Sequence, residues 1–354
     1  MIKYSSEAYT KPIWQGDTVE MEMFWPIKKD NEGVKVKLAY PVDEVISLCN
    51  SRLEREFVNG RDYTVEDGCI VIPENSEITV TPWEEIILDK PQEGAQLNIE
   101  ASIAGKYLFF SESSAISDKQ YTVKYKHSGK WQCVVPCRPD GKLSKIVEKI
   151  KRGDDFTFAF FGDSITVGAN SSGTDWINVP PYAPIWPKTV CNELERRYGG
   201  KISYINHAVG GKTSDWGVEE FKTLHEGENA DLFTIAFGMN DFTNPKFEEN
   251  IRTIMSYIWE KNPECEIILI STMLPNTYAK GFFNGQDKQE EILEKIAKEY
   301  SSVVLAPVTS VHKELLKNKF YFDMTGNCVN HPNDYGHRIY ASVLLEILTG
   351  EKFL

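Results

Sequence analysis

The spacing of hydrophobic and polar residues changes near the middle of this chain. In the first half, short runs rich in Val, Ile, Tyr and Thr alternate with turn residues, at 34–38, 61–65, 68–72, 78–80 and 120–126. Asn59-Gly60 and Asp67-Gly68 supply the positive φ angles that tight hairpin turns require. This pattern predicts an all-β, jelly-roll-like antiparallel sandwich over residues 1–150.

The second half alternates apolar runs with longer amphipathic stretches. The runs expected to form strands are 156–161, 202–205, 232–237, 267–271 and 303–305, and the expected helices are 142–152, 247–261, 286–300 and 335–348. Strands that are apolar throughout and separated by helices are typical of a parallel sheet covered on both faces. Residues 151–354 are therefore predicted to form a three-layer α/β domain whose ligands gather beyond the carboxyl ends of the strands.

The charge and composition of the chain exclude some classes of binding partner. The 354 residues include 39 Lys+Arg and 52 Asp+Glu, a net charge of −13, so we expect neither nucleic acid nor an anionic membrane as a partner. A membrane-spanning helix needs about 20 consecutive apolar residues, and the sequence has no such run. Residues 1–7 lack the apolar core of an export signal, and the seven scattered cysteines favour reduced thiols, so a cytoplasmic location is expected.

Polar residues cluster in the loops that follow the expected strands of the second half. These loops are 161–168, 206–214, 237–241 and 327–337. A serine hydroxyl becomes a nucleophile only when a base takes its proton, and the oxyanion that forms needs N–H donors. Ser164 supplies the hydroxyl and His331 the base, while the Gly211 N–H and the Asn240 carboxamide are the expected oxyanion donors.

The same residues carry a resemblance to a known family. Gly162-Asp163-Ser164-Ile165 resembles the first sequence block of the SGNH (GDSL-type) hydrolase superfamily, and Gly211, the run 238–241 and the run 331–334 match three later blocks in the family's order. The resemblance implies an esterase, deacetylase, lipase or thioesterase with a flavodoxin-like fold. It also implies the roles given above to Ser164, Gly211, Asn240 and His331.

One position departs from the family's pattern. The family usually has an Asp three residues before the catalytic His, where this chain has Cys328. A thiol cannot stabilise an imidazolium as a carboxylate does. We expect a main-chain carbonyl in the loop 327–330 to orient His331 instead, with Asp323 as the alternative.

Several polar residues near these motifs have structural interpretations. Ser164 could cap the helix that follows it, and Asn333 or Asp334 could cap the closing helix. Asp163 is expected to hold its turn through backbone hydrogen bonds, and Asp241 to tie loops together.

The other histidines compete with His331 for the role of base. His207 is expected to be packed or bonded to its loop, and His337 to face away from the site. His225 and His312 have no motif around them and are expected at the surface.

Aromatic residues after the nucleophile loop are candidates for a substrate pocket. Trp176, Tyr182 and Trp186 lie in a Pro-rich segment, and Trp216 follows the second block. Aromatic faces suit sugar rings and acyl chains alike. The alternative is that the segment packs against the β domain.

No cofactor and no metal are expected. His127 with Cys133 and Cys137 would be a zinc site without a fourth ligand. We therefore expect metal-independent hydrolysis of a small-molecule acyl ester. The two-domain order resembles certain carbohydrate esterases, which favours an acetylated sugar as substrate. The alternatives are a lipid or thioester acylhydrolase and, because of Cys328, a sugar-binding protein with a degenerate catalytic domain.

Overall fold

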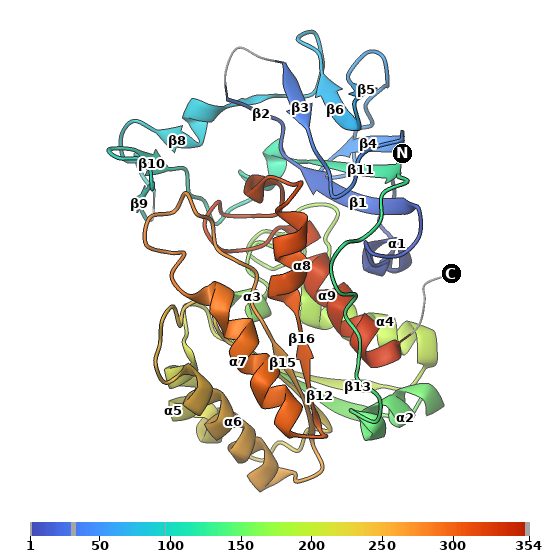
Figure 1. The fold of residues 1–354 in the computed structure, drawn as a ribbon, viewed down its shortest axis with the longest axis vertical. Helices are drawn as coiled ribbons and strands as arrows, with labels where there is room; N and C mark the ends of the chain where they lie inside the picture. Colours follow the sequence, from blue (N-terminus) through green and yellow to red (C-terminus); the bar gives the residue numbers. More distant parts are fainter. Residues whose placement is uncertain (1, 30–32, 96, 351–354) are drawn as a thin grey trace.

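The computed structural model describes residues 2–29, 33–95 and 97–350. The strands of the first half lie at one end of the molecule and the helices and parallel strands of the second half lie at the other (Figure 1). Within the described residues, no helix is long and apolar enough to cross a membrane. All seven cysteines are free.

The first half contains small sheets that are mostly antiparallel, as predicted. Two three-stranded sheets have the orders β1-β11-β4 and β3-β6-β5, with strands β1 (Thr18–Phe24), β3 (Val34–Val36), β4 (Glu44–Asn50), β5 (Thr64–Glu66), β6 (Cys69–Ile72) and β11 (Tyr121–Lys126). Leu48 and Val123 of the first sheet share a hydrophobic cluster with Val36 and Ile70 of the second. The two sheets therefore enclose a common core.

The remaining elements of the first half are short. They are α1 (Ser6–Thr10), β2 (Ile27–Lys28), β7 (Thr81–Pro82), η1 (Trp83–Glu85), β8 (Ile87–Leu88), β9 (Ile99–Glu100), β10 (Tyr107–Leu108) and η2 (Ser117–Lys119). Asp67 and Gly68 have φ angles of 52° and 72°, so the predicted hairpin turn between β5 and β6 is confirmed. The strand predicted at 78–80 is wrong, because pairing begins only at Thr81. The sequence pattern also missed β1 and β4.

The second half is built on one five-stranded parallel sheet of order β13-β12-β14-β15-β16. The strands are β12 (Phe156–Gly162), β13 (Ile202–Asn206), β14 (Leu232–Ala236), β15 (Glu266–Ile270) and β16 (Val303–Ala306). Each lies within a residue or two of its predicted position. The strand order of the sheet places β12 and β14 side by side, so the loops after these two strands leave the sheet at the same edge.

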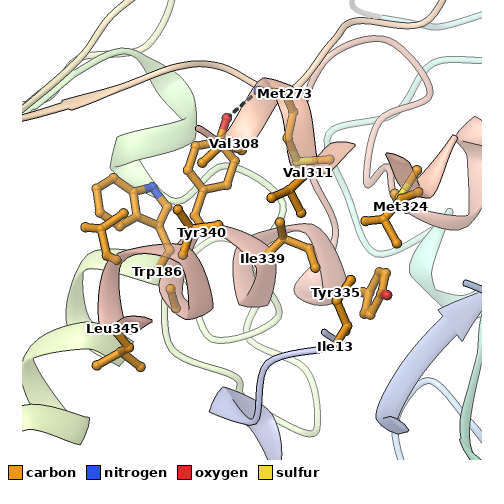
Figure 2. Close-up of a cluster of buried hydrophobic side chains, with 14 of the residues drawn as sticks. Ile13, Trp186, Met273, Val308, Val311, Met324, Tyr335, Ile339, Tyr340 and Leu345 are labelled. Atoms are coloured by element: carbon orange, nitrogen blue, oxygen red, sulfur yellow. Dashed lines mark hydrogen bonds between the residues drawn. The ribbon is translucent and has the colours of Figure 1, made fainter. Parts of the chain in front are cut away.

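Helices cover both faces of this sheet, which confirms the three-layer α/β fold. Phe158 and Phe160 of β12 share a hydrophobic cluster with residues of α2 (Ser144–Arg152), α4 (Trp186–Tyr198), α8 (Val308–Leu315) and α9 (Asp334–Thr349). Ala159 and Phe161 belong to a second cluster with α5 (Ser214–Leu224), α6 (Phe247–Lys261) and α7 (Gln286–Glu299). Successive side chains of a strand point to opposite faces, so both faces of β12 are buried. Figure 2 shows part of the first cluster around α9.

The two halves are joined by buried polar contacts as well as apolar packing. The ammonium of Lys319 lies 2.7 Å from a carboxylate oxygen of Glu22, and both side chains are fully buried. The guanidinium of Arg338, in α9, donates to the main-chain oxygens of Lys11 and Glu20. One hydrophobic cluster contains residues of both halves. The domain boundary near residue 150 therefore remains a prediction. The hydrophobic packing is continuous between the two halves.

Candidate active site

Ser164 begins the short helix α3 (Ser164–Val167) directly after β12. Asp163 precedes it, and its carboxylate accepts a hydrogen bond from the Ile165 N–H at 3.0 Å. Burial raises the pKa of Asp163 to about 7, although backbone hydrogen bonds oppose the shift. Asp163 thus holds the turn as predicted, and Ser164 is left with a hydroxyl that makes no capping bond to this helix.

His331 is held by a turn that is organised by one asparagine side chain. The Asn327 Oδ1 accepts hydrogen bonds from the N–H groups of Val329, Asn330 and His331. The His331 carbonyl accepts from the Gly326 N–H at 2.9 Å. This turn carries the imidazole to Ser164, where His331 Nε2 lies 2.9 Å from Ser164 Oγ.

The other ring nitrogen of His331 faces two side-chain oxygens. Nδ1 lies 2.9 Å from Asn170 Oδ1 and 3.0 Å from Glu112 Oε2. The Asn170 amide nitrogen donates to the Gly326 carbonyl, which fixes its oxygen toward the ring. Because both partners are acceptors, Nδ1 carries the proton and Nε2 has a free lone pair. His331 is therefore in the form that accepts a proton from Ser164.

Glu112 comes from the first half of the chain, between β10 and η2. Its Oε1 accepts from the Asn327 amide at 3.2 Å, and its side chain is 31% exposed. Burial alone would raise the pKa of Glu112, but hydrogen bonds and charge from His331, with the Asn327 bond, lower it overall. The carboxylate is consequently ionised beside the imidazole.

Both expectations about the group that orients His331 are wrong. The Asp323 carboxylate accepts from the main-chain N–H groups of Trp25 and Phe320 and makes no hydrogen bond with the His331 ring. No main-chain carbonyl of 327–330 bonds to Nδ1, which is occupied by Glu112 and Asn170. Those two residues lie 219 and 161 positions from His331. No local spacing in the sequence marks them.

Cys328 stands at the family's usual Asp position but does not face the imidazole. Its side chain is fully buried in an apolar cluster that includes Ile86 and Phe322. Burial raises the pKa of the thiol well above its usual value. Cys328 is thus a core residue of the contact between the two halves.

The predicted oxyanion donors lie in loops that contact each other. The Asn240 Nδ2 donates to the Lys212 carbonyl at 3.0 Å, which ties the loop after β14 to the loop after β13. A Cβ atom added to Gly210 would lie 3.8 Å from the Cβ of Ser164, so the loop that bears Gly211 passes close to Ser164. Gly211 itself is exposed and has a φ of +73°. Their roles as donors remain predictions.

Asp241 joins the same loops, as predicted. Its Oδ1 accepts from the main-chain N–H of Ser214 at 2.9 Å and from the Asn244 amide. Similarly, the Asn333 side chain caps α9 by accepting from the Gly336 N–H at 3.1 Å.

Burial excludes His225, His312 and His337 from the role of base. His337 is fully buried, and its Nε2 lies 2.9 Å from the Ala169 carbonyl. The prediction that His225 and His312 lie at the surface is wrong, since both are buried. The His312 Nδ1 accepts from the Leu274 N–H at 2.9 Å, and burial lowers its pKa to about 3.

Within the part of the chain that the structure describes, one group of three side chains has the spacing to hold a metal ion: His207, His225 and Glu228. His207 Nε2 lies 2.5 Å from Glu228 Oε1, and His225 Nδ1 lies 2.7 Å from Glu228 Oε2. The carboxylate thus already bonds to one nitrogen of each imidazole. This His–Glu–His bridge binds the loop after β13 to the end of α5, and His207 is bonded to its surroundings as expected.

The four aromatic candidates for the substrate pocket differ in their exposure. Trp176 and Tyr182 are both 55% exposed. The prediction for Trp186 is wrong, because it is 0% exposed and its indole N–H donates to the Ile165 carbonyl at 3.0 Å. Figure 2 shows its ring near Tyr340 of α9. Trp216 is half-buried against Phe161 and Phe237.

A hydroxyl and an imidazole are thus paired at the carboxyl edge of the parallel sheet of a three-layer α/β domain. Residues 160–339 match the model of the GDSL-like Lipase/Acylhydrolase family. The match covers more than half of the chain, which therefore belongs to this family. The SGNH (GDSL-type) resemblance is confirmed.

Solved structures with a related fold include two kinds of esterase. One is a two-domain esterase active on acetylated mannans, with 24% identity, 59% of this chain and 54% of that chain covered, and a TM-score of 0.48. Another is an acetylxylan esterase from Geobacillus stearothermophilus, with 20% identity and a TM-score of 0.46. That match covers 58% of this chain and 98% of the esterase. This chain thus aligns with about half the length of the first esterase. No curated protein matches the chain.

Proposed function

We propose that this chain hydrolyses carboxylic esters through an acyl-Ser164 intermediate. The Ser164 oxygen attacks the ester carbonyl while its proton passes to His331 Nε2, and the carbonyl oxygen becomes an oxyanion. The tetrahedral intermediate collapses, and the proton on Nε2 goes to the departing alcohol. A water molecule then attacks the acyl-serine, again with His331 as the base, which releases the acid and restores Ser164. The observation that supports this reaction mechanism is the 2.9 Å contact between Ser164 Oγ and His331 Nε2.

The oxyanion would be held by Gly211 and Asn240. An amide NH₂ has two hydrogens, and Asn240 uses one for the Lys212 carbonyl. The second hydrogen is left for the substrate. Each such donor typically contributes about 3–4 kcal/mol to the stability of the transition state.

The substrate we propose is a short acyl ester, an acetyl group on a sugar hydroxyl. The exposed surface beside Ser164 and His331 includes the carboxylate of Glu112, whose side chain is 31% exposed. A polar rim suits a polyhydroxylated alcohol, whereas a long acyl chain needs an apolar trough. The exposed rings of Trp176 and Tyr182 follow the nucleophile in the chain and would supply faces for sugar rings.

The experiment compares acetyl and octanoyl esters. We expect hydrolysis of p-nitrophenyl acetate and of acetylated mannan or xylan oligosaccharides, and little hydrolysis of p-nitrophenyl octanoate. Ser164→Ala should lower kcat by about 10⁴–10⁶-fold, since the nucleophile of a serine hydrolase cannot be replaced by water. Ser301→Ala, at an exposed serine, is the matched control and should keep full activity.

Two outcomes would contradict the proposal. Faster turnover of the octanoyl ester would favour a lipid or thioester acylhydrolase. Failure of Ser164 to react with an organophosphonate that labels activated serines would favour a binding protein with a degenerate site.

A further inference from the structure

We infer that Glu112 is the positioning residue for His331, so that the first half of the chain completes the catalytic site of the second. The inference rests on the proposed ester hydrolysis. It assigns to a residue of the β-rich half the role that the family usually gives to an Asp three positions before the His. In this chain that position is Cys328, whose side chain is enclosed in the apolar cluster between the halves.

The geometry places a carboxylate where an imidazolium needs one. Glu112 Oε2 lies 3.0 Å from His331 Nδ1, on the side of the ring opposite to the nitrogen that faces Ser164. When Nε2 takes the serine proton, the ring becomes positively charged. An ionised carboxylate within hydrogen-bond distance stabilises that charge, and the Nδ1 proton stays on the ring throughout.

The position of Glu112 is fixed from both halves. Its second carboxylate oxygen accepts from the Asn327 amide, and the oxygen of that same Asn327 side chain organises the turn of His331. Before it in the chain, the main-chain N–H of Phe109 bonds to the Ile86 carbonyl at 2.8 Å, and that of Phe110 to the Gln92 side chain at 3.1 Å. The carboxylate is thus held by hydrogen bonds to the second half, and the segment before it is held by hydrogen bonds within the first half.

Asn170 and Glu112 have different roles at His331 Nδ1. The neutral oxygen of Asn170 accepts at 2.9 Å and by itself keeps the proton on Nδ1. Glu112 adds the negative charge. Removal of Glu112 should therefore cost less than the roughly 10⁴-fold loss seen when a serine protease loses its triad carboxylate, because there the ring also takes the wrong tautomer.

The test is Glu112→Gln, which keeps the size of the side chain and removes its charge. We expect kcat and kcat/KM to fall together by about 100-fold with KM unchanged, since the interaction is made in the transition state. We also expect the acid limb of the pH–rate profile to move to lower pH, because a negative charge beside the protonated ring is lost. Glu112→Asp, which keeps the charge, should leave the acid limb closer to its wild-type position than Glu112→Gln does.

The matched control is Glu100→Gln, which removes an exposed carboxylate of the same half that pairs with Lys280. It should change neither rate nor profile. A merely structural role for Glu112 would lower the melting temperature and leave the acid limb in place, and that result would overturn the inference. So would a Glu112→Gln enzyme with wild-type rate.

The rate of organophosphonate labelling at Ser164 separates this inference from the proposed function. A wild-type protein that is not labelled would refute the proposed function. A labelled wild type with an equally fast Glu112→Gln variant would refute only the role of Glu112.

Discussion

Burial decides which histidine of this chain can act as a base. His312 and His337 are enclosed, and burial lowers their pKa values to about 3 and about 4. They stay neutral but cannot reach a substrate. His331 differs from them, because its Nε2 lies 2.9 Å from the Ser164 hydroxyl and its Nδ1 donates to the Glu112 carboxylate. The same residue type therefore has a packing role at two positions and a proposed chemical role at the third.

The buried His312 should make folding sensitive to acid. Its folded pKa of about 3 lies below the usual 6.5, so the unfolded chain binds a proton more readily. Its contribution to stability is complete above pH 6.5 and is lost as pH falls toward 3, by about 2 kcal/mol between pH 7.5 and 5. His312→Asn keeps an acceptor for the Leu274 N–H without this titration, so its free energy of unfolding in urea should fall less over that range. Equal pH dependence in both proteins would contradict the assignment.

At the scale of elements, the junction of β12 and α3 explains why Ser164 follows a glycine-containing turn. A Cβ at Gly162 would lie 2.5 Å from the Ala236 carbonyl of β14 and 2.6 Å from the Thr166 hydroxyl. Only glycine lets the neighbouring strand and the first turn of the helix approach this closely. The close approach brings the loops after β12 and β14 together.

Gly162→Ala should lower the free energy of unfolding by about 1–3 kcal/mol, because a methyl group is forced into filled space. Gly33→Ala is the matched control, since a Cβ there meets nothing within 4 Å. Thermal unfolding of both variants measures the difference. A Gly162→Ala protein as stable as the control would show that the strand and helix can move apart at no cost.

At the scale of the whole molecule, the two halves behave as one packed body. The hydrophobic cluster of α9 includes residues from the β-rich half, such as Ile13, which Figure 2 shows beside Tyr335. The Lys319–Glu22 pair and the Cys328 cluster lie between the halves. The proposed active site, which includes Glu112 of the first half, requires such a fixed arrangement.

We therefore expect one cooperative unfolding transition in calorimetry. Lys319→Met should lower stability by about 3–5 kcal/mol, because it leaves the Glu22 carboxylate buried without its cation. Lys317→Met, at an exposed lysine two positions away, is the control and should have little effect. Two separate transitions in the wild-type protein would contradict the single packed body.

The sequence alone predicted the strands of the parallel sheet and the helices α2, α6, α7 and α9, because hydrophobic periodicity is a local property. Its short motifs, in the order of a known family, also predicted that Ser164 and His331 meet, and the structure shows their contact. The tertiary structure alone decided what faces the second nitrogen of His331. Glu112 and Asn170 lie far from it in the chain, and nothing in their local surroundings distinguishes them from other polar residues. It also decided that Trp186, His225 and His312 are enclosed, since burial depends on which distant elements pack over a residue.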